Sequence, residues 1–210
     1  MLVLGLDTST PAVSVALVDT GGGLLAERVV VDARRHGELL AQGIAAVLAE
    51  ARVDRRDLGA VAVGLGPGPF TGLRVGVVTA ATLADALGIP SYGICSLDAL
   101  GTGERVAMTD ARRREVYWAR YDSGGARVDG PSVDKPADLV PRLDGIPVVG
   151  AGAMAYAEVL AGLDLRDEPL HPSATRVVEL ALQTEPGTLV PMYLRRPDAE
   201  EPGAPKRVTA

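Results

Sequence analysis

Residues 61–95 narrow the choice of fold more than any other part of the chain. Residues 61–65 predict a buried strand, a loop rich in glycine and proline follows, and residues 72–87 predict a helix that is apolar nearly all round. Gly88 is placed to end that helix, and residues 90–95 predict a second strand. A strand, a helix and a strand in this order close a parallel crossover, so the chain is expected to belong to the α/β class.

The chain before this crossover predicts the rest of one lobe. Three short runs rich in β-branched residues and leucine indicate an antiparallel meander, and apolar residues at helical spacing indicate a helix that covers it. The predicted strands are residues 2–6, 12–18 and 24–31, and the predicted helix is residues 36–51. Residues 1–96 are therefore expected to form an N-terminal lobe with the order β-β-β-α-β-α-β.

The second half of the chain has shorter elements and more turns, and it predicts a smaller C-terminal lobe over residues 97–196. Its last helix, capped by Ser173 or Thr175, is available to pack on the first lobe. Residues 197–210 mix proline, glycine and charge without periodicity and are expected to be disordered. The other predicted elements are a hairpin of residues 105–109 and 115–121, helices at 137–143 and 153–161, a strand at 147–149, and the last helix running to about 184.

Charge and composition exclude several classes of function. The 27 acidic and 21 basic residues give a net charge of −6 over 210 residues, so any RNA contact must be local or supplied by a partner. The single cysteine, Cys95, cannot form an internal disulfide, which favours a reducing compartment. The N-terminus does not read as a signal peptide, and the apolar stretches are shorter than the roughly 20 residues that span a bilayer. We expect a cytoplasmic protein with no membrane contact.

The histidines argue against a metal hydrolase. His36 and His171 are the only two in the chain, and neither has a second histidine four residues away, as a zinc-binding helix requires. His36 is expected to be a capping or surface residue, and Cys95 a small core residue. The sequence therefore predicts no metal site and no catalytic residue.

The loop between residues 64 and 74 is the strongest candidate for binding. Glycine-rich loops between a strand and a helix direct backbone N–H groups at an anion, although this one lacks the Walker A ending. Thr71 stands where a helix N-cap is expected, and Arg74 opposes the helix dipole and so needs a partner. That partner is either a carboxylate of this chain, Asp7 or Asp85, or an anion or another chain. The candidate phosphate or partner-contact residues are Asp7, Thr8, Ser9, Gly68, Thr71 and Arg74, with ordinary turn chemistry an equal explanation for the first three.

Arg112, Arg113 and Arg114 occupy the tip of the predicted hairpin. Arginines at such a tip are able to contact RNA phosphates, but charge runs at hairpin tips are usually solvated. Both interpretations stay open.

Small residues recur every fourth position on both helices predicted for the first lobe. A stripe of small side chains on an apolar helix lets a second backbone approach closely, which predicts an interface with another chain. The alternative is packing within the lobe, either between the two helices or against their own sheet. The predicted interface residues are Gly72, Gly76, Ala80 and Ala84 on the later helix, and Gly37, Ala41 and Ala45 on the earlier one.

Several motifs, in order along residues 1–196, resemble the bacterial TsaB family. Pro69, where the family often carries serine, is the one departure from the loop pattern. The motifs are Asp7-Thr8-Ser9, the loop from Gly66 to Arg74, Asp110-Ala111-Arg112-Arg113 followed by Glu115-Val116-Tyr117, and Tyr193-Leu194-Arg195.

The resemblance implies an actin-like ATPase (ASKHA) fold, shared by sugar kinases and Hsp70, with two small lobes that are each a mixed sheet covered by helices. It also implies a non-catalytic subunit for the transfer of threonylcarbamoyl to N6 of adenosine 37 in tRNAs that read ANN codons. The alternative is an active actin-like ATPase or kinase that uses Asp7, Thr8, Thr71 and the turn at Gly150.

The same resemblance implies the partners. A TsaD-like protein is expected to bind through the first-lobe helices, with a second copy of this chain in its place when it is missing, and a TsaE-like ATPase is expected to join the pair. ATP and metal would belong to those partners, and none is expected on this chain. Contact with tRNA is expected to be indirect or weak.

Overall fold

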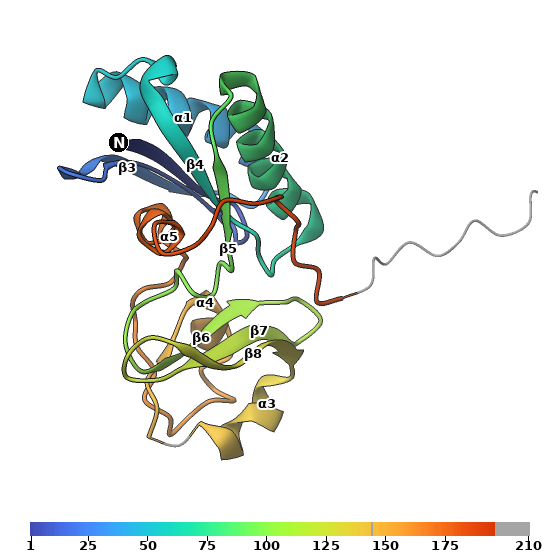
Figure 1. Ribbon diagram of the computed structural model, residues 1–210. Helices are drawn as coiled ribbons and strands as arrows, with labels where there is room; N and C mark the ends of the chain where they lie inside the picture. The colour runs from blue at the N-terminus through green and yellow to red at the C-terminus, as the bar shows by residue number, and fades with distance from the viewer. Residues whose placement is uncertain (144, 196–210) are drawn as a thin grey trace, which may run out of the picture.

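The computed structural model describes residues 1–143 and 145–195, which form two sheets with helices packed on them (Figure 1). In the first sheet the strand order is β3-β2-β1-β4-β5. Strands β1, β2 and β3 are antiparallel, whereas β4 and β5 run parallel to β1. The strands are β1 (Leu2–Asp7), β2 (Ala12–Asp19), β3 (Gly23–Val31), β4 (Leu58–Gly64) and β5 (Ser91–Ile94).

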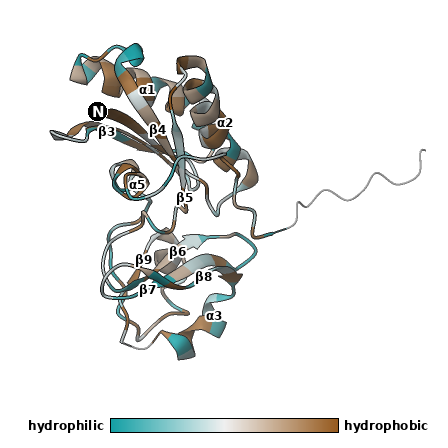
Figure 2. Cartoon of the chain, in the orientation of Figure 1, coloured by the Kyte–Doolittle hydropathy of each residue, from teal (hydrophilic) through white to brown (hydrophobic). Residues whose placement is uncertain are grey.

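Helices cover both faces of this sheet. Helices α1 (His36–Ala51) and α2 (Phe70–Leu87) lie on one face, and α5 (Ala174–Ala181) lies on the other (Figure 1). Alternation along the strands explains the two layers, because Leu4 and Leu6 of β1 join the core under α1 and α2 while Val3 joins the core under α5. Figure 2 shows the apolar strands between their helices. The last helix therefore does pack on the first lobe.

The second sheet has the order β8-β7-β6-β9, with β6 antiparallel to β7 and parallel to β9. The division expected at residue 96 falls between β5 and β6. The elements of this half are β6 (Arg105–Asp110), β7 (Val116–Tyr121), β8 (Arg127–Asp134), α3 (Pro136–Leu139), β9 (Val148–Val149) and α4 (Ala151–Ala155), with short 3₁₀ turns η1 (Arg55–Asp57) before β4 and η2 (Val140–Arg142) after α3.

Three expectations about the elements are wrong. Strand β8 was not predicted, because it is an edge strand with mostly exposed side chains and a Gly130-Pro131 pair that obscures any alternation. The helix predicted at 153–161 spans only Ala151–Ala155. The backbone N–H groups of Tyr156 and Ala157 donate to carbonyls three residues earlier, which is the 3₁₀ pattern and not the α-helical one. The helix predicted to run to 184 ends at Ala181.

Helix α2 begins earlier than expected. Its N-cap is Pro69, with φ −59° and ψ 131°, and no side chain caps the first turn. Thr71 lies inside the helix and is exposed, so the prediction that it is the N-cap is wrong. Proline fixes φ at about −65°, as observed at Pro69, and it has no side-chain oxygen with which to cap the first turn.

By length and composition alone, α2 is long and apolar enough to cross a membrane. No other helix among the described residues meets these two criteria. Leu73, Val77 and Ala80 are buried against the first sheet, as in the core helix of a globular lobe.

The strand order and the placement of α1 and α2 confirm the actin-like fold class, two mixed sheets with helices. The expectation of disorder at 197–210 lies outside the described residues.

Candidate binding site

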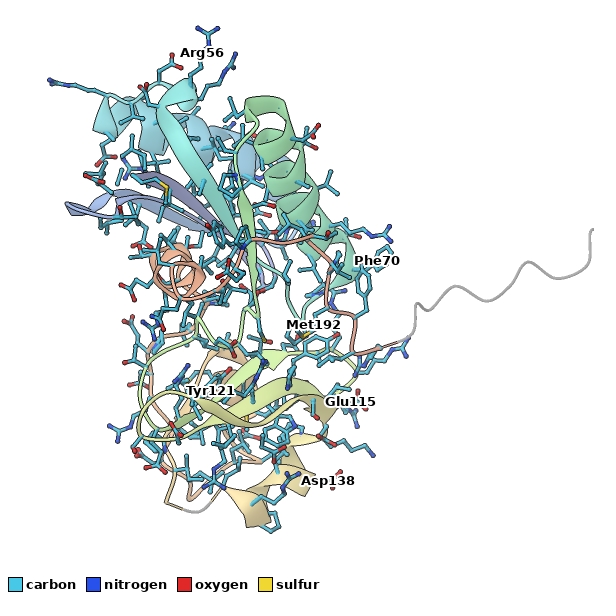
Figure 3. All side chains as sticks on the ribbon, viewed as in Figure 1. Arg56, Phe70, Glu115, Tyr121, Asp138 and Met192 are labelled. Atoms are coloured by element: carbon cyan, nitrogen blue, oxygen red, sulfur yellow. The ribbon has the colours of Figure 1, made fainter. Side chains whose placement is uncertain are left out.

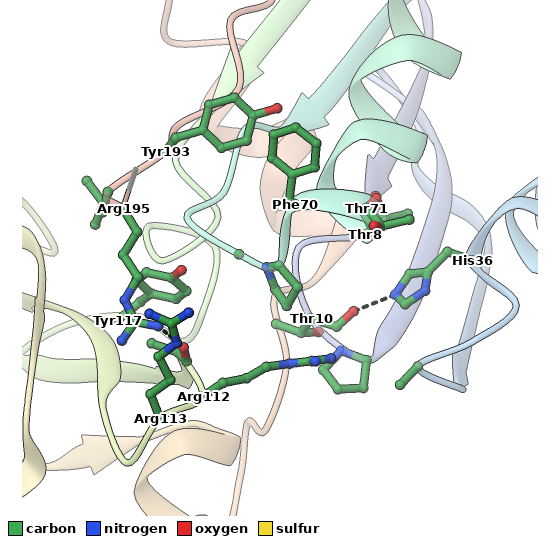
Figure 4. Close-up of a pocket in the computed structure, with 17 residues that line it drawn as sticks. Thr8, Thr10, His36, Phe70, Thr71, Arg112, Arg113, Tyr117, Tyr193 and Arg195 are labelled. Atoms are coloured by element: carbon green, nitrogen blue, oxygen red, sulfur yellow. Dashed lines mark hydrogen bonds between the residues drawn. The ribbon is translucent and has the colours of Figure 1, made fainter. Parts of the chain in front are cut away.

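A cavity of about 700 Å³ lies between the two lobes, a size typical of small-ligand sites. Four segments that are far apart in the sequence line it, together with Ala33, His36 and Tyr117 (Figure 4). They are the β1–β2 turn (Thr8, Thr10, Pro11), the loop and start of α2 (Gly68, Pro69, Phe70, Thr71, Gly72), the β6–β7 turn (Ala111, Arg112, Arg113) and the C-terminal segment (Tyr193, Leu194, Arg195).

The acid and hydroxyls of the β1–β2 turn are bound within the protein. Asp7 Oδ1 accepts from the backbone N of Ser9 at 2.9 Å and from its Oγ at 2.7 Å. Thr8 Oγ1 donates to the carbonyl of Gly72 at 2.8 Å and accepts from the N–H of Gly76 at 3.0 Å. All three polar residues are about 1% exposed, and only Thr8 lines the cavity. The turn interpretation therefore describes Asp7 and Ser9 better than a phosphate site does.

Burial has the largest effect on the pKa of Asp7. Loss of hydration raises the pKa of its carboxyl, and hydrogen bonds from Ser96 and Ser9 lower it by less. Its Oδ2 atom faces Gly64, where a side chain would overlap it. Asp7 is therefore held behind the cavity, without access to a ligand in it.

The loop before α2 also lies where the sequence predicted. A Cβ on Gly68 would be 2.1 Å from the carbonyl oxygen of Ser9, so only glycine lets the loop approach the β1–β2 turn this closely. Gly68 and Thr71 thus both reach the cavity, at the end of α2 where the first N–H groups have no partner in the helix.

Arg74 has aromatic partners. Its Nε donates to the hydroxyl of Tyr193 at 2.8 Å, and its guanidinium lies 3.7 Å from the ring centroid of Phe70. The two rings stack with centroids 5.1 Å apart, and we call them the Phe70–Tyr193 pair. Among the described residues, neither Asp7 nor Asp85 pairs with Arg74, so the first alternative, a carboxylate of this chain, is wrong.

The β6–β7 turn carries three consecutive arginines in the left-handed region. Arg112, Arg113 and Arg114 have φ values of 58°, 55° and 63°. Each such residue costs about 1–2 kcal/mol, a strain that proteins keep mainly at functional sites.

Arg195 holds this turn in place. Its Nη1 donates to the carbonyl of Ala111 at 2.6 Å, and it forms an ion pair with Glu115. Arg112 and Arg113 are exposed, and both side chains point into the cavity (Figure 4).

Both histidines meet at one residue, which their separation in the sequence could not reveal. His36 Nε2 donates to the backbone carbonyl of Thr10 at 2.8 Å, and His171 Nδ1 lies 3.3 Å from the hydroxyl of Thr10. Burial lowers the pKa of His171. Among residues 1–143 and 145–195, no group of three His, Cys, Asp or Glu side chains is placed to hold a metal ion.

The two stripes of small residues have opposite environments. Gly72, Gly76, Ala80 and Ala84 are buried in their own lobe, so the prediction that these four face another chain is corrected to the alternative, packing against the sheet. Thr8 and His36 cover Gly72, Thr8 covers Gly76, and Ala80 and Ala84 belong to the core of the first lobe. Gly37, Ala41 and Ala45 of α1 are exposed, and no atom lies within 4 Å of where a Cβ on Gly37 would be.

Cys95 follows β5 and is buried, as expected of a core residue. Burial, with a smaller contribution from Asp98, raises the pKa of its thiol to about 11. At pH 8 such a thiol is about one part in a thousand thiolate, against about a quarter for an ordinary cysteine of pKa about 8.5. We expect the native protein to react with a disulfide reagent at least about 100-fold more slowly than the denatured protein. Equal rates in a stopped-flow or absorbance assay would contradict this.

A family model described as TsaD, tRNA N6-adenosine threonylcarbamoyltransferase, matches residues 19–160. An uncharacterized protein of Mycobacterium tuberculosis is 49% identical, covering 94% of this chain and 93% of the relative. The tRNA threonylcarbamoyladenosine biosynthesis protein TsaB of Escherichia coli is 32% identical, covering 93% of this chain and 95% of the relative. Among solved structures, YeaZ from Pseudomonas aeruginosa matches with a TM-score of 0.79 and 30% identity, covering 92% of this chain and 99% of that one.

Proposed function

The chain belongs to the TsaB family of tRNA threonylcarbamoyladenosine biosynthesis proteins, and from this membership we propose that it is a non-catalytic subunit in that tRNA modification. Its role is in threonylcarbamoyladenosine biosynthesis. In the proposed reaction a TsaD-like partner transfers threonylcarbamoyl to N6 of adenosine 37 in tRNAs that read ANN codons. The observation that carries the proposal is the likeness to TsaB of Escherichia coli over 93% of the chain.

The proposed partner is a TsaD-like protein. The TsaD model matches residues 19–160, which include α1, α2 and all four strands of the second sheet. Two proteins built on the same lobe can pair through equivalent surfaces, much as two identical copies do about a two-fold axis. A heterodimer, and a homodimer when this chain is alone, are therefore the proposed assemblies.

The proposed contact is the outer helix face, which we define as Gly37, Ala41 and Ala45 of α1 with Val78 and Ala81 of α2. All five are exposed, and Val78 exposes 59% of its surface. Small and apolar side chains on two neighbouring helices allow a second pair of helices to approach closely. This face replaces the buried stripe of α2 as the candidate interface.

Internal hydrogen bonds support a non-catalytic role. The alternative ATPase or kinase would use Asp7 and Thr8, but both side chains form hydrogen bonds within the first lobe. Both histidines contact Thr10. In the proposal, ATP and metal bind to the partner proteins and not to this chain. A TsaE-like ATPase docks on the heterodimer, and the assembly is cytoplasmic. ATP hydrolysis by the purified chain at an enzyme-like rate would instead favour the ATPase.

Reconstitution tests the proposal directly. A TsaD-like protein, a TsaE-like ATPase, tRNA and threonylcarbamoyl-adenylate are combined with this chain or without it, and modified adenosine is measured by mass spectrometry. We expect modification to fall to background without this chain. Equal modification in the two reactions would defeat the proposed function.

A further inference from the structure

We propose that residues 187–195, which we call the C-terminal strap, hold the two lobes together across the cavity and are released as one unit. With the strap bound, the lobes keep the arrangement seen here. When it is released, the lobes hinge apart and the cavity opens. This device lies within one chain, so it is independent of the proposed function.

The strap passes from the first lobe to the second outside any helix or strand. It runs beside β5, where the N–H of Gly187 donates to the carbonyl of Ser91 at 3.1 Å. Further along, the N–H of Met192 donates to the carbonyl of Leu65 at 2.7 Å. Figure 1 shows this red segment passing β5 and α2 on its way to the second lobe, and Figure 3 labels Met192 between the lobes.

Two side chains anchor the strap on the first lobe. Leu189 packs against the core under α1 and α2. Tyr193 stacks on Phe70 and accepts a hydrogen bond from Arg74 Nε at 2.8 Å. Stacked rings and a cation packed on a ring attract each other beyond the area that they bury, so Tyr193 is the stronger of the polar contacts that fix the strap to α2.

Three side chains anchor the strap on the second lobe. Met192 and Leu194 pack against the apolar cluster that contains Ala111 of the β6–β7 turn. Arg195 Nη1 donates to the carbonyl of Ala111 at 2.6 Å, and its guanidinium forms an ion pair with Glu115. Neighbouring residues of the strap thus bind different lobes, and loss of either anchor weakens the other.

The remaining links between the lobes form a hinge. The two chain connections, residues 95–104 and 156–173, are joined by the N–H of Ser173, which donates to the carbonyl of Ala99 at 3.1 Å. Among the described residues, the extensive contacts of every helix and strand lie within its own lobe, with α5 belonging to the first. Lobes with so little direct packing are expected to move relative to each other. The strap forms one wall of the cavity and is therefore placed to oppose that motion.

The strap is held less firmly than the sheets that it joins. It has no regular structure, Val190 and Tyr193 expose 64% and 40% of their surface, and the ion pair of Arg195 with Glu115 is partly exposed to solvent. Segments with few buried contacts open at a lower free energy than the lobes on which they lie. The strap is therefore expected to be released while both lobes stay folded.

Amide hydrogen exchange of the full chain tests release as a unit. Tyr193→Ala removes the polar anchor on the first lobe. The N–H groups of Ala111 and Glu115 are hydrogen-bonded within the β6–β7 turn of the second lobe, and we expect them to exchange about tenfold faster in this variant. Tyr193→Phe keeps the ring stack and is expected to restore most of the protection. Val190→Ala is the matched control, because it changes an exposed side chain of the same strap.

Spin labels at the outer ends of the lobes measure whether the lobes then move. Figure 3 labels Arg56 at the far end of the first lobe and Asp138 at the far end of the second, and both are exposed. Labels are attached to Arg56→Cys and Asp138→Cys, whereas Cys95 is buried. An excess of unlabelled chain keeps the measured distances within one molecule. We expect one narrow distance with the strap unmodified, and a shifted and broader distribution with Tyr193→Ala.

Faster exchange confined to the strap, with the turn and the distance distribution unchanged, would overturn the proposal, because the strap would then hold nothing in place. A broad distribution with the strap unmodified would also overturn it. Faster exchange in the strands of both sheets of Tyr193→Ala would contradict release of the strap alone. None of these measurements uses a partner protein, so their outcome does not depend on the proposed function.

Discussion

Replacing Gly76 with leucine is expected to lower the melting temperature of the protein by about 10 °C, because the substitution overpacks the first lobe and breaks a buried hydrogen-bond pair. A Cβ at this position would lie 2.4 Å from Thr8 Oγ1, which is closer than non-bonded atoms approach. The Thr8 hydroxyl joins the N–H of Gly76 to the carbonyl of Gly72, and it is buried. Overpacking costs about 1–3 kcal/mol, and a lost buried hydrogen bond about as much again. Together they remove a large share of a typical unfolding free energy of about 5–15 kcal/mol.

The same substitution at Gly37 is the matched control. Gly37 is also helical and also belongs to a row of small residues, but no atom lies within 4 Å of where its Cβ would be. Glycine is a poor helix former, so Gly37→Leu is expected to leave the melting temperature unchanged or slightly higher. Circular dichroism melts of both variants, at a concentration at which the chain is a monomer, make the comparison. Equal melting temperatures for Gly76→Leu and the unmodified chain would mean that this stripe does not face its own sheet.

This contrast shows what residue spacing predicts and what it omits. Spacing by four identifies small residues on one side of a helix, and it does so equally well for Gly37 and Gly76. It does not say which side meets the core, because that depends on Thr8, which comes from the β1–β2 turn 68 residues earlier. Helix α1 and the strands of the first sheet were predictable. Successive residues of a strand point to opposite faces, and Val3 and Leu4 are both apolar because both faces of this sheet are buried.

The candidate site follows the same rule. Gly68 and Thr71 could be located from the loop pattern, because a strand followed by a glycine-rich turn and a helix brings that loop to a sheet edge. The partner of Arg74 could not, since Tyr193 is 119 residues away and no periodicity relates them. The junction of His36 and His171 at Thr10 is likewise a product of the tertiary fold. Local patterns therefore located the loops, and long-range contacts decided which side chains point into the cavity.

A negative charge at Val78 is expected to abolish assembly with the TsaD-like partner while leaving this chain folded. Val78 exposes 59% of its surface on the outer helix face, so Val78→Asp changes the stability of the isolated chain by no more than about 0.5 kcal/mol. In the proposed interface the carboxylate would lose its hydration without gaining a partner, at a cost of about 2–5 kcal/mol. The dissociation constant should rise by roughly 30-fold or more, since each 1.4 kcal/mol is tenfold.

Val128→Asp is the control for this experiment, because Val128 is the same residue type with nearly the same exposure, 56%, on strand β8 of the second sheet. Analytical ultracentrifugation or surface plasmon resonance measures the affinity of each variant for the partner, and circular dichroism confirms that each is folded. We expect Val78→Asp alone to lose binding and, in the reconstituted reaction, to lose modification in proportion. If Val128→Asp weakens the complex and Val78→Asp does not, the partner docks on the second sheet, and the outer helix face must have another use.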